Sequence, residues 1–267
     1  MASPDAAATR ESAHLGLLLP DGVPVPLVRV RDRRARRLRL TVNERGVRLS
    51  VPLRVPEHVA EAFVQDQLGW IAAQWGRLRD PRGPVEWAFG AVAALPLAGE
   101  ECVIEWIEAR SARIERVAAD ADAASGAGPD RLRILAPASA SAAALRRALA
   151  EFYAAEARTA IQRWLPAYLP GLPRPPRAFR VRALSSLWGS LAADGTVSLD
   201  LALVLGPPAA LEYVLVHEIC HLIHANHSPA FWREVEARLP HWREQRAFLR
   251  GAAGGRMKGR LRALLGG

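Results

Sequence analysis

The sequence predicts an α+β fold, in which an N-terminal antiparallel sheet with one helix precedes a mainly helical half that contains a small sheet. Polar and apolar residues alternate over residues 38–51, which is the pattern of half-buried strands. Strands joined by turns this short pair antiparallel, because a parallel pair needs a long crossover. A doubly wound sheet is mainly parallel, so these antiparallel pairs favour α+β over a doubly wound sheet.

The first twenty residues are predicted to be a flexible leader. They contain neither the basic nor the apolar region of a signal peptide, and no apolar run in the chain approaches the roughly 20 residues of a membrane helix. The two cysteines, Cys102 and Cys220, lie far apart and form no CxxC pair, so no disulfide framework is expected. We therefore expect a cytoplasmic protein without membrane contact.

The first sheet is predicted from strands at Leu38–Val42 and Val47–Val51, on either side of a turn over residues 43–46. A helix is predicted to begin at Pro56 and to run to about Leu78, because its apolar residues recur at helical spacing. Further short strands are expected at Val85–Phe89, Cys102–Ile107, Ile114–Val117 and Leu132–Leu135. Together these segments predict a β-rich region over residues 21–137.

The second half is predicted to begin with an Ala-rich helix from about Ala142 to Leu165, which the Pro-rich segment LPGLPRPP ends. This half is expected to extend over residues 138–250. Residues 251–267 are predicted to be a mobile basic tail, because their charged residues include no acid: Arg256, Lys258, Arg260 and Arg262.

The chain is strongly basic, with a formal net charge of +9, and Lys258 is its only lysine. A basic balance favours polyanionic partners such as nucleic acid or nucleotides. Seven arginines gather around the first predicted strand: Arg29, Arg31, Arg33, Arg34, Arg36, Arg37 and Arg39. They form either a solvated basic face or an anion-binding surface, and the sequence leaves both interpretations open.

The stretch VHEICHLIHANHS holds four of the seven histidines. It closes an apolar segment that is predicted to form a largely buried helix. His217 and His221 are four residues apart, about 40° apart on one helix face, where two imidazoles can bind one zinc ion. Glu218 lies beside the first of them. The alternative is a pair of core histidines with a paired glutamate, but a charged side chain on a buried helix is costly without a partner.

A catalytic zinc site needs a third protein ligand, for which His224 and His227 are the candidates. His224 stays on the same helix face but lies about 10 Å along the axis from His217, too far to share one ion. His227 can return to the metal if the chain turns first. Asn226 suits the end of a helix, and Ser228 with the following proline suits the start of the next. We therefore predict His227 as the third ligand.

The segments RALSSLWGS and GTVSLDLALVLGPPAALEYVLVHEICHLIHANHSPAFW resemble the YgjP-like family of zinc metallopeptidase domains, relatives of the SprT-like proteins. The matching residues are Trp188, Gly189, Ser190, Pro208, Tyr213, Val214, His217, Glu218, Cys220, His221, Asn226, His227, Ser228, Phe231 and Trp232. The opening strands are also similar, so the resemblance covers roughly residues 25–250. It implies a zincin-like metalloprotease half, zinc ligands at His217, His221 and His227, and a catalytic role for Glu218.

The chain departs from the family pattern beside the site. Leu191 stands where the family usually has a cysteine after WGS, and Asp200 replaces the usual asparagine. The residues SSL precede Trp188 where a basic residue is common. None of these positions belongs to the metal triad, so they bear on the substrate wall, and Trp188 is interpreted as a packing residue under the site.

The chemistry expected of this site is hydrolysis by a zinc-activated water, with Glu218 as general base. The first interpretation is a metallopeptidase that acts on a peptide or protein substrate. The second is hydrolysis of a nucleotide phosphoanhydride, with Arg180 or Arg182 receiving phosphate charge. The third is a nucleic-acid-associated protease that the basic N-terminal strands recruit.

Overall fold

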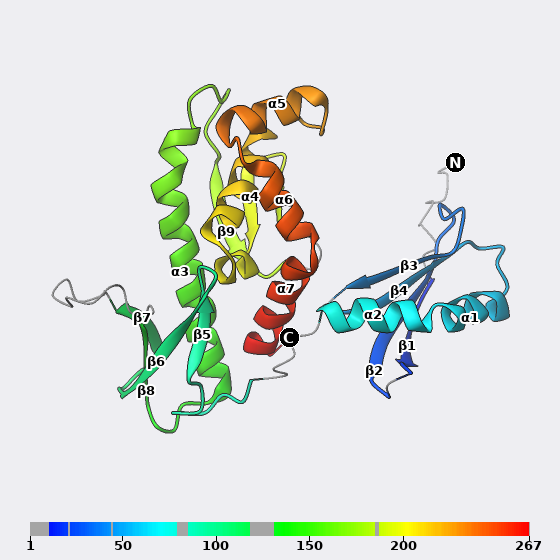
Figure 1. Ribbon diagram of the computed structural model, residues 1–267, viewed down its shortest axis with the longest axis horizontal. Helices are drawn as coiled ribbons and strands as arrows, with labels where there is room; N and C mark the ends of the chain where they lie inside the picture. Colours follow the sequence, from blue (N-terminus) through cyan, green and yellow to red (C-terminus); the bar gives the residue numbers. More distant parts are fainter. Residues whose placement is uncertain are drawn as a thin grey trace, which may run out of the picture. The chain divides into compact units, whose positions relative to one another are not determined.

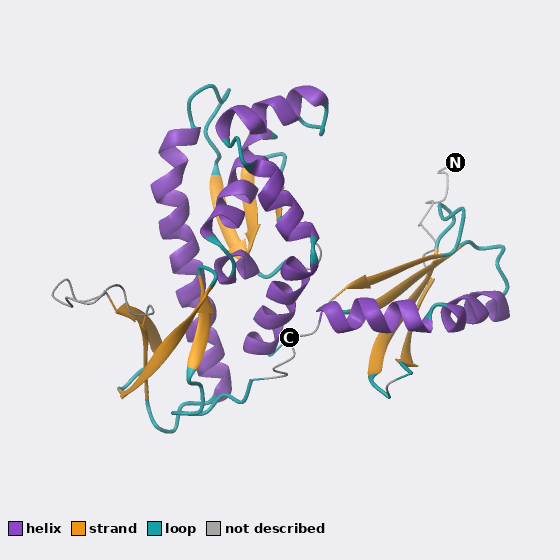
Figure 2. Ribbon diagram, viewed as in Figure 1, coloured by secondary structure: helices purple, strands orange, loops and turns teal. Residues whose placement is uncertain are grey.

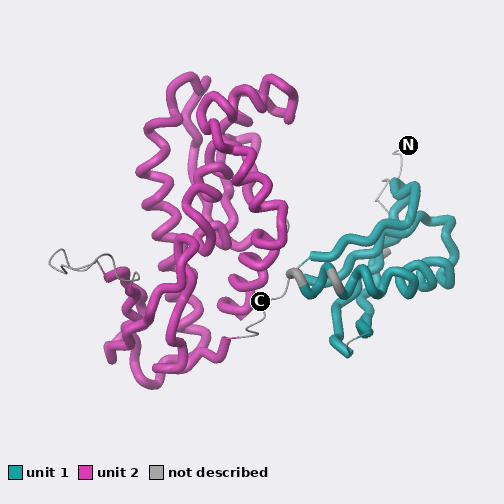
Figure 3. Tube along the Cα trace, in the orientation of Figure 1, with its two compact units in different colours: residues 1–79 teal, residues 80–267 magenta. Residues whose placement is uncertain are grey.

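The computed structural model describes residues 11–20, 22–43, 45–78, 85–117, 131–184 and 187–266. These residues form helices and three sheets, which confirms the predicted α+β class (Figure 2). The chain divides into two compact units, residues 1–79 and 80–267 (Figure 3). The division falls inside the predicted β-rich region 21–137, so that region is not one structural unit.

The first unit packs two helices on a four-stranded sheet. Its elements are β1 (Glu11–Leu18), β2 (Pro24–Arg31), β3 (Arg39–Asn43), β4 (Gly46–Val51), α1 (Glu57–Asp66) and α2 (Leu68–Leu78) (Figure 1). The sheet has the order β1-β2-β4-β3, with antiparallel pairs β1–β2 and β3–β4 and a parallel pair β2–β4. The two pairs joined by short turns are antiparallel, as predicted, and the parallel pair joins strands that are separated in the chain.

Two predictions for this unit need correction. Residues 11–18 are not a flexible leader: they pair along the whole of β2 as strand β1, whose Leu17 is buried in the core of the unit. The first ten residues of the predicted leader lie outside the described part of the chain. The single helix predicted from Pro56 is two helices, because the backbone leaves helical geometry at Gln67.

The second unit begins with another mixed sheet. Its strands are β5 (Ala94–Leu97), β6 (Glu100–Glu108), β7 (Arg113–Val117) and β8 (Arg131–Ala136), in the order β5-β6-β8-β7. Their buried residues share one core with the long helix α3 (Ala142–Tyr168), and the buried Tyr153 hydroxyl donates to the Pro96 carbonyl at 2.7 Å. This shared core is why these strands belong with the C-terminal half instead of with the first sheet.

The strand predicted at Val85–Phe89 is absent. The Trp87 indole instead donates a buried hydrogen bond of 2.7 Å to the Leu264 carbonyl, which holds the segment against the C-terminal helix α7 (Ala252–Leu265). The nearest strand is β5, which begins at Ala94.

A three-stranded sheet and the remaining helices complete the second unit. The strands are β9 (Ala178–Arg182), β10 (Gly189–Leu191) and β11 (Thr196–Asp200), in the order β10-β11-β9, and β11 is buried throughout. A 3₁₀ helix, η1 (Leu201–Leu205), leads into α4 (Pro208–Cys220), α5 (Pro229–Arg238), α6 (Trp242–Arg250) and α7. Within the described ranges, no helix is long and apolar enough to cross a membrane.

The basic tail is also not mobile, because residues 252–265 form α7. Met257, Leu261 and Leu264 recur at helical spacing and are buried against the rest of the unit. The ammonium group of Lys258 lies 2.8 Å from the Asp200 carboxylate, and both side chains are buried. The sequence predicts that Lys258 is solvated, but its ammonium group is buried and pairs with Asp200 at the end of β11.

Candidate metal centre

Helix α4 carries the first part of the histidine cluster. It begins at Pro208, and proline is favoured in a first helical turn because its missing N–H has no partner there. Nearly all its later residues are buried in the core, which confirms the predicted buried helix. His217 and Glu218 lie in its last turn, and His221 caps its end.

The helix ends earlier than predicted. Its last residue is Cys220, whereas the prediction placed the turn at Asn226. The N–H groups of residues 221–223 each donate to the carbonyl three residues earlier, at 3.0–3.2 Å, which tightens the final turn and ends the helix. His224 therefore lies in the connection that follows the helix.

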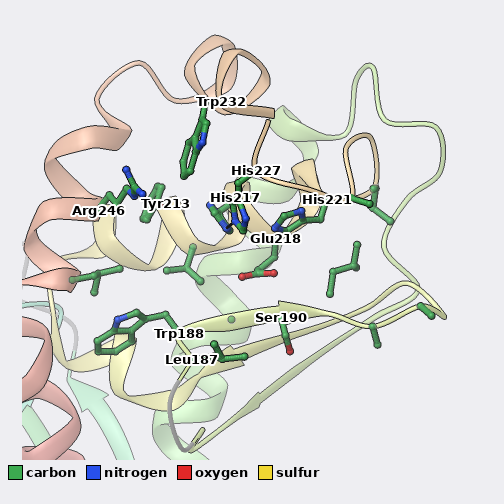
Figure 4. A pocket seen from close by; sticks show the side chains of 18 of the residues that line it. Leu187, Trp188, Ser190, Tyr213, His217, Glu218, His221, His227, Trp232 and Arg246 are labelled. Atoms are coloured by element: carbon green, nitrogen blue, oxygen red, sulfur yellow. Dashed lines mark hydrogen bonds between the residues drawn. The ribbon is translucent and has the colours of Figure 1, made fainter. Parts of the chain in front are cut away.

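The connection from α4 to α5 returns the chain to the helix face. The Asn226 side chain accepts a hydrogen bond from the Ser228 N–H at 3.2 Å, and the Ser228 hydroxyl caps α5 by accepting from the Phe231 N–H at 3.3 Å. Proline at the first position of α5 completes the helix start that the sequence predicts. His227 precedes this cap and points back toward α4 (Figure 4).

The structure brings His217, His221 and His227 together. Each offers a ring nitrogen, and these three atoms lie within 4.8 Å of one another. The Nε2 atoms of His217 and His227 are 3.0 Å apart. His227 is the exposed member of the group, and the other two are partly buried. Three converging imidazoles with one open side can hold a metal ion.

Neighbouring groups orient these rings. The His221 Nδ1 atom lies 3.0 Å from the main-chain oxygen of His224, so this nitrogen donates and Nε2 is left with its lone pair. Phe231 is fully buried and packs against all three rings, with centroids 4.5–4.9 Å apart. Nδ1 of His217 is buried without a hydrogen-bond partner among the described residues.

The surroundings keep two of the imidazoles neutral. Burial, with the nearby His221 and His227, lowers the pKa of His217 to about 3. Burial, with His221 and Arg246, also lowers the pKa of His227. A histidine binds a metal through its neutral form, so these shifts favour metal binding over protonation at neutral pH.

Glu218 lies in a tight, buried position beside the histidines. Its side chain is buried, and burial raises its pKa to about 7 against the lowering effect of a main-chain hydrogen bond from Leu191. A Cβ atom at Gly189 would lie 2.7 Å from the Glu218 carboxylate, closer than real Cβ contacts. The glycine of the WGS segment therefore leaves the space that this carboxylate occupies.

A cavity of about 980 Å³ opens over the histidines and Glu218. Its floor is α4, one wall is the β10 region with Trp188 and Ser190, and another is formed by Trp232 and Arg246 from the helices that follow (Figure 4). Trp188 therefore lines the cavity as well as packing beneath it. Arg180 and Arg182, predicted as phosphate ligands, are exposed on β9 and do not line the cavity.

Two residues near the site were missed in the sequence. Arg246 follows no spacing that links it to the histidines, so only the packing of α6 reveals it. Lys258 did leave a signal, because Asp200 stands in the apolar run SLDLALVL and a buried acid there requires a partner. The Lys258 ammonium group also donates to the Leu187 carbonyl at 2.9 Å and lies 4.6 Å from the Trp188 ring centroid.

Three comparisons relate the chain to known proteins, and only the family match bears on this site. The chain is similar over 37% of its length to the abylysin metallopeptidase zymogen of Pyrococcus abyssi, at 27% identity, with 91% of that chain covered and a TM-score of 0.26. The comparison with curated proteins found no match. The family described as "YgjP-like, metallopeptidase domain" matches residues 36–252, which include every residue of the candidate metal centre. The chain therefore belongs to the YgjP-like metallopeptidase family.

Proposed function

We propose that this protein is a zinc-dependent metallopeptidase, in which His217, His221 and His227 hold one zinc ion and Glu218 is the general base. The observation that carries the proposal is the convergence of three imidazole nitrogens beside a buried glutamate at the floor of a large cavity. Membership of a metallopeptidase family supports peptide hydrolysis as the reaction.

The donor set fits zinc. Three neutral imidazoles with one open position are a common ligand set of catalytic zinc, and zinc–nitrogen distances of about 2.0–2.1 Å place two ligating atoms roughly 3.3 Å apart. The 3.0 Å between the Nε2 atoms of His217 and His227 is close to that separation. The His224 carbonyl orients His221 as the outer partners of zinc-binding histidines do.

A zinc ion held by these three histidines would act as a Lewis acid toward the hydrolytic water and the scissile carbonyl. Glu218 does the proton transfer: its carboxylate accepts a proton from the attacking water and then delivers it to the leaving amine. In the metal-free site burial raises the pKa of this carboxyl to about 7, and the charge of a bound zinc ion would lower it again, so that the group is a carboxylate able to accept the proton at neutral pH. A hydrogen bond from the Leu191 main chain holds the carboxylate in place, and the lack of a side chain at Gly189 leaves the space that it occupies.

The shape of the cavity favours a peptide over a nucleotide. Strand β10 is an edge strand of its sheet, and Gly189, Ser190 and Leu191 all line the cavity. An extended peptide can add to such an edge through main-chain hydrogen bonds. The arginines expected to bind phosphate, Arg180 and Arg182, lie outside the cavity, which removes the support that these two residues gave to phosphoanhydride hydrolysis.

The variant Glu218→Gln tests the proposal, and Glu212→Gln is its matched control. Glu212 lies on the same helix, where its carboxylate accepts a hydrogen bond from the Tyr168 hydroxyl. We expect Glu218→Gln to retain one zinc ion per chain and to lose about 10²–10⁴-fold in peptide hydrolysis, because an amide cannot accept a proton. Glu212→Gln should keep both properties. His217→Ala and His221→Ala should each lose most of the metal, measured by elemental analysis.

A panel of peptides and nucleoside triphosphates separates the two hydrolase classes. Hydrolysis of triphosphates without hydrolysis of peptides would overturn the peptidase assignment. Unchanged turnover in Glu218→Gln would overturn the role of the glutamate, and full zinc retention in both histidine variants would overturn the site.

A further inference from the structure

The charged residues that line the cavity are mainly basic. Arg174, Arg246 and Arg250 line it, whereas Glu218 is its one acidic residue within the described part of the chain. Glu218 lies at the floor and is engaged with the metal centre, so no acid of the lining is placed to neutralise the arginines on α6. An anionic group of a bound substrate meets a positive wall there.

Arg246 is held toward the histidines by aromatic stacking. Its guanidinium carbon lies 4.6 Å from the Trp232 ring centroid and 5.7 Å from that of Trp242. The two indoles stack on each other at 4.4 Å, and the Trp232 ring also stacks with the ligand candidate His227 at 5.5 Å. The guanidinium group is thus positioned on the same aromatic stack that borders the metal centre (Figure 4).

This arginine has no acidic partner among the described residues. Arg243, one turn earlier on α6, also stacks on Trp242, at 4.7 Å, but it is exposed and paired with Glu236. Arg246 is half-buried, lines the cavity and forms no such pair with any residue that the structure describes. A fixed guanidinium group with unused donors is suited to bind a carboxylate through two parallel hydrogen bonds.

We propose that Arg246 is a specificity-determining residue that binds a carboxylate of the peptide substrate. The carboxylate belongs either to an acidic side chain near the scissile bond or to the C-terminus of the peptide. The inference rests on the proposed peptidase function and names its substrate class. Arg250, one turn further along the same face of α6, adds positive charge to the same wall of the cavity.

Two sets of probes distinguish the sources of the carboxylate. The first is a series of acetylated and amidated octapeptides in which a single Glu or Gln occupies each position in turn. The second is a neutral octapeptide with either a free or an amidated C-terminus. Cleavage by the zinc-loaded protein gives kcat/KM, and calorimetric titration of the metal-free protein gives affinity without catalysis.

We expect the peptides that carry one of the two kinds of carboxylate to exceed their neutral counterparts by roughly 10- to 100-fold in kcat/KM and in affinity. This preference is the effect expected of a charged hydrogen bond. Arg246→Met keeps an apolar stem on Trp232 and should abolish the preference in both measurements, while cleavage of neutral peptides continues. Arg243→Met, the matched control, should leave the preference unchanged. Arg246→Lys should restore only part of it, because an ammonium group lacks the planar fork.

Equal affinity and equal kcat/KM for carboxylate and neutral peptides in the unaltered protein would overturn the inference, as would a preference that survives Arg246→Met. Cleavage of neutral peptides without any preference overturns the inference and leaves the proposed function standing. If no peptide is cleaved, the proposed function fails, and the affinities of the metal-free protein still decide the carboxylate site.

Discussion

The His221 ring donates from Nδ1 to the main-chain oxygen of His224, 3.0 Å away. His224 thus contributes its backbone to the metal centre, while its imidazole lies outside the group of three that converges there. The tightened end of α4 makes this possible, because it places the His224 carbonyl beside the preceding turn. A histidine in the middle of a histidine-rich stretch therefore acts through an atom that any residue possesses.

We expect His224→Ala to leave zinc affinity nearly unchanged and His227→Ala to weaken it severely. The first variant keeps the carbonyl that orients His221, whereas the second removes one of the three proposed ligands. Competition with a chromophoric zinc chelator measures both affinities. Loss of metal in His224→Ala together with retention in His227→Ala would mean that the third ligand is His224.

Gly189→Ala should impair hydrolysis while zinc stays bound. The new Cβ would meet the Glu218 side chain and Val214 at 2.7–2.8 Å, so the carboxylate has to move, and none of these three nearest atoms belongs to a histidine. Gly69→Ala is the matched control, because a Cβ there meets nothing within 4 Å. Activity of both variants equal to that of the unaltered protein would show that the carboxylate does not need its present position.

The stability of the metal-free protein should reveal the burial of Glu218. Its pKa is raised from 4.5 to about 7, so between these values the folded protein keeps a proton that the unfolded chain has released. The stabilising contribution of this group is present below pH 4.5 and is lost as the pH rises toward 7. Glu218→Gln removes that loss, since an amide does not titrate.

We therefore expect Glu218→Gln to gain stability relative to the unaltered protein between about pH 5 and about pH 8. Urea unfolding in the presence of a chelator measures the difference. His217 has the opposite effect on the pH dependence, but it is present in both proteins. A stability difference that does not change with pH would contradict the burial of an ionisable carboxyl group.

Removing one member of the buried Lys258–Asp200 pair should lower the free energy of unfolding. Lys258→Met leaves the carboxylate without its partner, and such a loss costs about 3–5 kcal/mol of unfolding free energy. Burial already raises the pKa of Asp200, against the lowering effect of Lys258. Adding Asp200→Asn to Lys258→Met should recover much of the loss, because the uncompensated charge is gone. A double variant no more stable than Lys258→Met would exclude charge as the cause.

The basic first unit gives a prediction for nucleic acid. Arg29 and Arg31 both pair with Glu57, which leaves five exposed arginines of the cluster: Arg33, Arg34, Arg36, Arg37 and Arg39. If they recruit nucleic acid, fluorescence anisotropy with a labelled duplex should show binding that weakens steeply with salt. Replacing the five by glutamine should remove that dependence. An absence of binding at low salt would identify the cluster as a solvated face.

Local patterns explain which parts of the structure were predictable. The hairpin at residues 38–51, the long helix after residue 142 and the HExxH helix each depend on periodicity or spacing within one segment, and all three form. The convergence of His227 with His217 and His221 was predictable too, because turn and cap residues lie between them.

Long-range contacts explain the rest. Segment 85–89 has the composition of a strand, but its Trp87 finds a partner 177 positions away in α7. The C-terminal segment looks like a solvated tail because its charges dominate, and only the fold shows that Lys258 meets Asp200. The arginine of the cavity wall, Arg246, gains its place from helix packing, which no pattern within α6 encodes.

The chain carries 35 further basic residues as arginine and a single amine side chain, that of Lys258, which is only 9% exposed. An amine-reactive label can reach that side chain only when α7 lifts away from Asp200 and Trp188. The rate of acylation at this one lysine, followed by mass spectrometry, therefore reports how often the C-terminal helix α7 opens. No engineered probe is needed, and a label on Lys258 marks molecules in which α7 has separated from Asp200 and from Trp188.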